Sequence, residues 1–226
     1  MAASTPTLLK ADAEGIAAAI AVLQSGGIIA APTDTVYGIA ASLQQPAALQ
    51  RLFLAKGRDA AKAIPVLLAD AAGAETLADD PSQLATLAAS FWPGALTIVV
   101  TARAGLPAEI LTPDANGTPT VALRVPDNAI MRALCRASGG ALAVTSANRS
   151  GLPPATSARE VIEAGLPDLA AVVDGGQTPG AVPSTIVALR GGDVALIREG
   201  IIPYANVTDI ATAGHAVEPQ RGMISR

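Results

Sequence analysis

The 226-residue sequence holds few of the side chains that enzymes use for nucleophilic or metal chemistry. It contains one cysteine, Cys135, and one histidine, His215. A single cysteine excludes an internal disulfide framework and a cysteine-based zinc cluster. A single histidine, placed in a polar C-terminal segment, argues against a histidine-centred triad. Any chemistry must therefore depend on lysine, arginine, hydroxyl, tyrosine, aspartate and backbone groups.

Aromatic residues and long apolar runs are also scarce. Aromatics make up 2% of the chain and hydrophobic residues 50%, so the core must consist of alanine, valine, leucine and isoleucine. No apolar run approaches the roughly 18 to 20 residues that cross a bilayer. The N-terminal stretch "MAASTPTLLKADAEG" lacks the basic and apolar regions of a secretory signal. We therefore expect a soluble, cytoplasmic protein with no membrane contact.

The net charge of -4 argues against a protein whose main task is to grip a nucleic-acid backbone. A local basic pocket is compatible with that charge. Three familiar signatures are missing: the G-x-x-x-x-G-K-[ST] loop, G-x-G-x-x-G after a strand, and the G-x-S-x-G elbow. A nucleotide, if bound, must be bound by other means.

Apolar patterning predicts helices and strands in alternation. We expect helices over 11–27, 45–58, 79–92 and 128–140, and a short one from the capping box at 157–160. We expect strands over 27–32, 64–69, 95–102, 120–126, 141–145 and 169–176, and a hairpin over 184–200 around Gly191-Gly192. This order favours one α/β domain with a mixed sheet. The segment after Ile202 is expected to be a tail or a short appended element.

Two polar clusters lie in the first third of the chain. The stretch "APTDTVYG" places Thr33, Asp34, Thr35 and Tyr37 just after a predicted strand, which suits either a small polar ligand or a simple turn. Lys56, Gly57 and Arg58, followed by Lys62, form a reasonable phosphate grip. Taken alone, these cations fit a solvated basic helix end better.

Two further clusters lie near the ends of later strands. Ser146 and Asn148, followed by Ser150 and Gly151, could hydrogen-bond a ligand at the carboxyl end of a strand or form local turns. Ser184 and Thr185 lead into the hairpin, and its paired arms can bring Arg198, on the far arm, near the sheet end that carries these hydroxyls. The alternative for Arg198 is a solvent-facing charge on an edge strand.

Six segments together resemble the YrdC/Sua5 family of threonylcarbamoyl-AMP synthases. They are "GGIIAAPTDTVYGIAAS", "LFLAKGRDAAKAIPVLLA", "FWPGALTIVV", "VALRVPDN", "AVTSANRSGLPPATS" and "PSTIVALRGGDVALIREG", in the family's order. The resemblance spans roughly Leu8 to Ile202. It implies an α/β (α+β) fold of the YrdC/RibB type, a strongly bent mixed β-sheet flanked by helices around a concave pocket. It further implies a YrdC-like domain over 8–202 and a C-terminal tail over 203–226, with no second domain.

The family's reaction joins L-threonine, bicarbonate (or CO2) and ATP into threonylcarbamoyl-AMP for the t6A modification of tRNA. The resemblance implies that Mg2+ enters with the ATP phosphates and is not held by protein ligands. It also implies that the product passes to a tRNA threonylcarbamoyl transferase complex, and weak tRNA binding is a further expectation. The implied threonine-binding residues are Thr33, Thr35, Tyr37, Arg124, Ser184 and Thr185. The implied ATP-binding residues are Lys56, Arg58, Lys62, Thr97, Ser146, Asn148, Thr156 and Arg198, with Lys56 and Arg58 catalytic.

The sequence departs from the family pattern at two places. Asp59 follows the Lys-x-Arg motif where many relatives have proline, and Leu67 and Leu68 stand where some members carry a histidine that contacts threonine. Alternative interpretations are a non-catalytic YrdC-like RNA-binding module, a carbamoyl-adenylate-forming domain, and a paralogue with another substrate.

Overall fold

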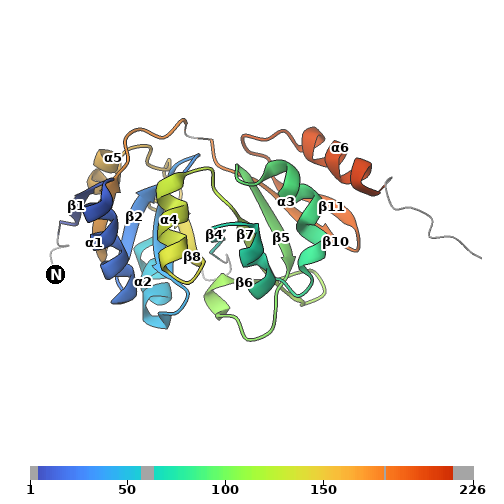
Figure 1. The fold of residues 1–226 in the computed structure, drawn as a ribbon, viewed down its shortest axis with the longest axis horizontal. Helices are drawn as coiled ribbons and strands as arrows, with labels where there is room; N and C mark the ends of the chain where they lie inside the picture. The colour runs from blue at the N-terminus through green and yellow to red at the C-terminus, as the bar shows by residue number, and fades with distance from the viewer. Residues whose placement is uncertain (1–4, 57–63, 181, 216–226) are drawn as a thin grey trace, which may run out of the picture.

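The computed structural model describes residues 5–56, 64–180 and 182–215. Within these residues, eleven strands form one mixed sheet (Figure 1), in the spatial order β1-β9-β2-β3-β8-β4-β7-β5-β10-β11, with β6 paired to β7. The strand bounds are Thr7–Lys10 (β1), Ile28–Pro32 (β2), Tyr37–Ser42 (β3), Val66–Leu68 (β4), Leu96–Thr101 (β5), Leu111–Pro113 (β6), Pro119–Arg124 (β7), Ala141–Ser146 (β8), Leu169–Asp174 (β9), Thr185–Arg190 (β10) and Asp193–Arg198 (β11).

Helices cover the sheet on both sides. The α-helices are Ala13–Gln24 (α1), Pro46–Lys56 (α2), Ala85–Phe91 (α3), Ala129–Ala137 (α4), Ala158–Glu163 (α5) and Tyr204–His215 (α6). Short 3-10 helices are Ala71–Thr76, Pro81–Leu84 and Ala108–Ile110. Buried residues of α1 and α4 share one apolar cluster, whereas those of α2, α3, α5 and α6 belong to another. The predicted mixed sheet flanked by helices is confirmed.

Strand β2 shows why the sequences of the central strands are continuous apolar runs. All five of its residues are buried. Ile28 and Ala30 belong to one apolar cluster, and Ile29 and Ala31 belong to the other. Because successive side chains of a strand point to opposite faces, each face of the sheet packs against its own core. A strand buried on both faces carries no polar alternation.

Side-chain caps explain where several helices begin. Asp12 accepts a hydrogen bond from the Gly15 backbone N–H at 2.9 Å, and Asn128 accepts one from Met131 at 3.0 Å. Asp80 accepts a hydrogen bond from the Ser82 backbone N–H, but the helix predicted over 79–92 is divided into a 3-10 turn followed by α3. Such caps satisfy N–H groups that have no partner within the helix.

The expected capping box at 157–160 forms with a changed partner. Ser157 accepts from the Glu160 backbone N–H at 3.2 Å, as predicted. The Glu160 carboxylate accepts from the backbone N–H of Thr156, at 2.6 Å, where the capping box would use the N–H of Ser157. The glutamate therefore ties the preceding loop, and Thr156 with it, to the start of α5.

The apolar pattern of the sequence predicted the hairpin but did not predict every strand. Strands β1 and β3 were not predicted. Strand β1 has only four residues, and β3, which follows the polar turn at 33–36, is buried throughout and shows no alternation of apolar and polar residues. The hairpin of β10 and β11 is confirmed, with Gly191 and Gly192 at φ 58° and 94° in its turn. Positive φ at both central residues is the geometry of a two-residue hairpin turn. The expected tail contains helix α6, which packs against α3 and β11.

An ion pair shows that the sheet curves. Arg124, the last residue of β7, contacts Asp34, which lies in the turn between β2 and β3. Strands β8 and β4 separate β3 from β7 in the sheet, so a flat sheet would hold the two about 14 Å apart. A bend of the sheet toward itself shortens this separation and brings the two side chains into contact.

The single cysteine is part of the core beneath α4. Cys135 is fully buried, and its thiol donates to the Leu67 carbonyl oxygen at 3.3 Å. Burial raises the pKa of this thiol to about 12. None of the helices in the described ranges is long and apolar enough to cross a membrane.

We predict that Gly15→Ala destabilises the protein, although alanine is the better helix former by about 1 kcal/mol. A Cβ at position 15 would lie 2.0 Å from the Lys10 carbonyl oxygen, and relieving such overpacking typically costs about 1 to 3 kcal/mol. Urea unfolding should show a lower midpoint.

The matched control is Ala17→Gly at an exposed position of the same helix, which should lose only the propensity difference of about 1 kcal/mol. A Gly15→Ala protein more stable than wild type would show that β1 and α1 can separate freely.

A cationic cavity as the candidate functional site

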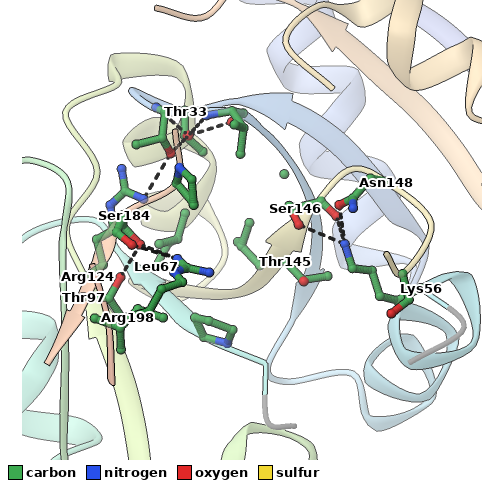
Figure 2. A pocket seen from close by; sticks show the side chains of 18 of the residues that line it. Thr33, Lys56, Leu67, Thr97, Arg124, Thr145, Ser146, Asn148, Ser184 and Arg198 are labelled. Atoms are coloured by element: carbon green, nitrogen blue, oxygen red, sulfur yellow. Dashed lines mark hydrogen bonds between the residues drawn. The ribbon is translucent and has the colours of Figure 1, made fainter. Parts of the chain in front are cut away.

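A cavity of about 290 Å³ lies where the bent sheet faces itself (Figure 2). This volume is at the lower end of the range for small-molecule sites. The lining includes residues from β3, β8, β4, β5 and β10 and from the turns beside them. Nine of the predicted site residues lie in this lining: Thr33, Thr35, Lys56, Thr97, Arg124, Ser146, Asn148, Ser184 and Arg198.

Thr33 builds the turn that forms one wall. Its hydroxyl accepts from the backbone N–H groups of Thr35 and Val36, each at 3.1 Å, and donates to the Val36 carbonyl at 2.7 Å. It also lies 3.0 Å from the Thr35 hydroxyl. The turn interpretation of this stretch is therefore confirmed, and the turn places Thr33 and Thr35 in the lining of the cavity, where contact with a ligand stays a prediction. The turn is made by Thr33, and Asp34 has another partner.

Arg124 joins this wall to β7. Its Nε donates to the Gly94 carbonyl at 2.9 Å, Nη1 donates to the Thr35 hydroxyl at 3.3 Å, and Nη2 pairs with the Asp34 carboxylate. The two charged side chains are 6% and 14% exposed. Burial lowers the pKa of Arg124 from its ordinary value, and the Asp34 charge opposes that shift. Arginine nevertheless remains a cation near neutral pH.

Lys56 ends α2 on the opposite side of the cavity. Its Nζ donates to the Ser146 carbonyl at 2.6 Å, to the Ser146 hydroxyl at 2.9 Å and to the Asn148 side-chain oxygen. Lys56 is only 6% exposed, so the solvated helix end favoured by the sequence is wrong for this residue. Arg58 and Lys62 lie outside the described residues.

Arg198 reaches the cavity from the end of β11. Its Nη2 donates to the Ser184 carbonyl at 2.8 Å, and the Ser184 hydroxyl lies 2.9 Å from the Thr97 hydroxyl. The expectation that the hairpin brings Arg198 to the hydroxyls of the neighbouring strand is confirmed.

Figure 2 shows two polar groups facing each other across the cavity. Thr33, Arg124, Thr97, Ser184 and Arg198 lie on one side, and Lys56, Ser146 and Asn148 lie on the other. Apolar Leu67 and Val144 lie in the lining and also belong to the core beneath α1 and α4. Among the described lining residues, three are cations and none is a carboxylate. The arrangement therefore favours a ligand that carries negative charge.

The donor set does not fit a resident divalent cation. The described lining offers hydroxyl and amide oxygens without a carboxylate, whereas Mg2+ sites in proteins normally use one or two carboxylates. In the described parts of the chain, no group of three or more histidine, cysteine, aspartate or glutamate residues could hold a metal.

Three predicted ligand residues lie outside the described lining. The Tyr37 ring is fully buried, and its hydroxyl donates to the Gly176 carbonyl at 2.8 Å and accepts from the Gly175 N–H at 3.2 Å. Burial raises the pKa of this phenol. The Tyr37 side chain therefore lies outside the cavity lining, where its hydroxyl links β3 to the loop after β9.

Thr156 and Thr185 also use their hydroxyls within the protein. Thr156 donates to the Glu160 carboxylate at 2.9 Å. Thr185 is fully buried and bonds the backbone of Gly200 and Ile202. Each hydroxyl is hydrogen-bonded within the protein, which the sequence motif alone does not reveal. A ligand role for either residue stays a prediction.

Some lining residues were missed by sequence reasoning. Gly38 lines the cavity, and a Cβ there would meet a Val144 methyl at 2.5 Å, so a side chain would collide with the neighbouring strand. Val144 and Ile186, which also line the cavity, were predicted only as strand residues. Asp34 was recognised as a turn residue, and nothing in its local pattern points to a partner 90 positions away.

The fold is a mixed α/β architecture, and its cationic cavity favours a small ligand that carries negative charge. The Sua5/YciO/YrdC family model, described as "Telomere recombination", matches residues 21–200. The chain belongs to this family, as the sequence motifs predicted.

Named relatives and a solved structure agree with this assignment. A threonylcarbamoyl-AMP synthase of Bacillus subtilis is 37% identical over 82% of this chain and 53% of its own length. The chain thus spans about half the length of that relative. A threonylcarbamoyl-AMP synthase of Chromohalobacter salexigens is 38% identical over 82% of this chain and 98% of its own length. The structure of P. abyssi Sua5 complexed with L-threonine superposes with a TM-score of 0.82, at 32% identity, covering 92% of this chain and 61% of that one.

We predict that Tyr37→Phe lowers the free energy of unfolding by about 1 to 3 kcal/mol, because two backbone groups lose a buried partner. Chemical denaturation measures this loss. Tyr204→Phe is the matched control: that hydroxyl donates to the Val194 carbonyl from a partly exposed ring, so its loss should cost less. A Tyr37→Phe protein with unchanged stability and weakened ligand binding would return Tyr37 to the ligand site.

Proposed function

We propose that this protein synthesises threonylcarbamoyl-AMP from L-threonine, bicarbonate or CO2, and ATP. The observation that carries the proposal is the cavity itself, which combines Lys56, Arg124 and Arg198 with hydroxyls and no described carboxylate. Two of the three substrates are anions and the threonine carries a carboxylate, so this charge pattern suits all of them. The names of the relatives and the threonine complex of the P. abyssi protein support the same reaction.

The proposed chemistry needs no enzyme nucleophile. The threonine amine takes up CO2 with loss of a proton, and the resulting carbamate oxygen attacks the α-phosphorus of ATP. The bond from that phosphorus to the bridging oxygen breaks, and pyrophosphate leaves with the electron pair. Positioning and electrostatic stabilisation of phosphate charge can supply such catalysis. This agrees with a chain that has one buried cysteine and one histidine.

The two sides of the cavity suggest a division of roles. We assign Arg124, with Thr35 beside it, to the threonine carboxylate, because a guanidinium matches a carboxylate in shape and charge. We also assign Thr33 and Ser184, which lie on the same side of the cavity as Arg124 (Figure 2), to the threonine site. We assign Lys56 to the phosphates and to catalysis, and Ser146 and Asn148 to the nucleotide.

The remaining assignments follow from the same division. Arg198 would meet the phosphates from the hairpin, with Thr97 beside it. Arg58 and Lys62, whose placement is not described, are assigned to the phosphates by the family motif alone. Mg2+ would enter bound to the ATP phosphates, since the described lining offers it no carboxylate. We further propose a cytoplasmic reaction whose product passes to a tRNA threonylcarbamoyl transferase.

The proposal predicts pyrophosphate release from ATP and bicarbonate that depends on L-threonine. L-Serine should support release about 10- to 200-fold less well, because one methyl group rarely gives more discrimination. Lys56→Ala should lose at least about 100-fold in turnover, a loss of some 2.7 kcal/mol of transition-state stabilisation. Lys10→Ala, an exposed lysine on β1, should match wild type.

Folded wild-type protein that binds ATP but releases no pyrophosphate with any amino acid would overturn the proposal. In that case, tighter binding of tRNA than of ATP would indicate the RNA-binding module instead.

A second prediction concerns Arg124. Arg124→Ala should weaken L-threonine binding by about tenfold or more, which is about 1.4 kcal/mol, while ATP affinity changes less. Isothermal titration calorimetry with each ligand measures both. The matched control is Arg132→Ala, which also removes an arginine paired with an aspartate, but at the surface. Unchanged threonine affinity in a folded Arg124→Ala protein would remove Arg124 from the threonine site.

A further inference from the structure

The entry to β10 crosses the segment that follows β11, and hydrogen bonds join the two. The Thr185 hydroxyl accepts from the backbone N–H groups of Gly200, at 2.9 Å, and Ile202, at 3.1 Å, and donates to the Ile202 carbonyl at 2.5 Å. The Ile201 N–H donates to the Pro183 carbonyl at 3.1 Å. We call this crossing of residues 183–185 over 200–202 the clasp.

The Thr185 hydroxyl has no capacity left for a ligand. A hydroxyl offers one donor and two acceptor lone pairs, and the three bonds of Thr185 use all of them. The residue is also fully buried. Contact with a substrate would therefore require breaking a bond within the clasp, so Thr185 must act through the groups that it holds.

Residues that line the cavity lie within the clasp and directly beside it. Ser184 precedes Thr185, and Arg198 lies two positions before Gly200. The Arg198 Nη2 donates to the Ser184 carbonyl at 2.8 Å, so the guanidinium spans from one side of the crossing to the other. An increase in the separation of the two crossing segments would pull the donor and the acceptor of this bond apart.

Gly200 allows the close approach. A Cβ at position 200 would lie 2.2 Å from the Pro183 carbonyl oxygen and 2.6 Å from the Ser184 carbonyl oxygen. These are backbone atoms that cannot rotate away, and the second is the acceptor of the Arg198 bond. The glycine is required here for space, because any side chain would push the two segments apart.

The position of Arg198 in the sheet explains why a clasp is needed. Strand β11 is last in the sheet order, and its partner within the described chain is β10. The register between the two strands shifts near Ile186, beside the pair that includes Arg198. Ladder bonds alone therefore hold this end of β11 weakly, and an arginine that must be ordered on binding costs affinity.

We propose that Thr185 and Gly200 are positioning residues that hold the Arg198 guanidinium against Ser184, ready for the phosphates of ATP. The proposal deepens the function proposed above and rests on it, since that function assigns Arg198 to the phosphates. It assigns to Thr185 a role different from the ligand contact that the motif suggested.

The central experiment is a double-mutant cycle on ATP binding, measured by calorimetry. Thr185→Val keeps the shape of the side chain and removes the hydroxyl. It should weaken ATP binding by about the same factor as Arg198→Ala, roughly tenfold, or 1.4 kcal/mol. The double variant should be no weaker than either single variant, because both remove the same contact. Losses that multiply in the double variant, or unchanged ATP affinity in Thr185→Val, would overturn the proposal.

Two further variants separate positioning from simple loss of stability. Thr185→Ser restores the hydroxyl and should recover ATP affinity to within about threefold, or 0.65 kcal/mol. Gly200→Ala keeps the hydroxyl but opens the crossing, and should lose about as much affinity as Thr185→Val. Its matched control is Gly180→Ala, since a Cβ at position 180 meets nothing within 4 Å among the described residues. If Thr185→Val does not fold, Thr185→Ser and Gly200→Ala test the proposal instead. Wild-type ATP affinity in folded Gly200→Ala would then overturn it.

Steady-state kinetics give an independent readout. The clasp variants should raise the KM for ATP with little change in kcat, as expected when a binding contact is lost. A different result would contradict the proposed function: wild-type protein that releases no pyrophosphate. ATP calorimetry still tests the clasp in that case, because it does not need turnover.

Discussion

The buried guanidinium of Arg124 is the group on which the cavity depends. A cation removed from water is costly unless hydrogen bonds and an opposite charge replace the water. Here those partners come from two places in the chain: one is the Gly94 carbonyl, and the other is the turn after β2, which supplies the Thr35 hydroxyl and the Asp34 carboxylate. Each partner must stay in place for the charge to remain buried. The end of β7 and the turn after β2 are therefore held together by the same interactions that place a cation in the lining of the cavity.

The alanine-rich core has a related consequence. Small side chains bring the helices and strands close together, as shown by the near contact of Gly15 with Lys10 and of Gly38 with Val144. Close packing leaves little room for adjustment, so the polar side chains of the site come from turns and element ends. Lys56 ends α2, Ser146 ends β8, and Arg198 ends β11.

Local patterns predicted what depends on neighbouring residues. The run over 27–32, the glycine pair of the hairpin and the Ser157 cap all have causes within a few positions, and the structure contains each of them. Lys56, Ser146 and Asn148 were recognised because polar residues directly follow apolar runs. The partner of Asp34, the saturated hydroxyl of Thr185 and the buried role of Tyr37 depend on contacts 15 to 139 positions apart. No local pattern carries that information, and the family motif identifies such residues without distinguishing a ligand contact from a support.

The buried thiol of Cys135 has a practical consequence for spectroscopy. It is the chain's single cysteine, and its pKa of about 12 leaves almost no thiolate at neutral pH. Maleimide reagents should therefore pass over the native protein. A cysteine introduced on the hairpin or on α6 would then carry a fluorophore or spin label at one known place, without first removing a residue from the core.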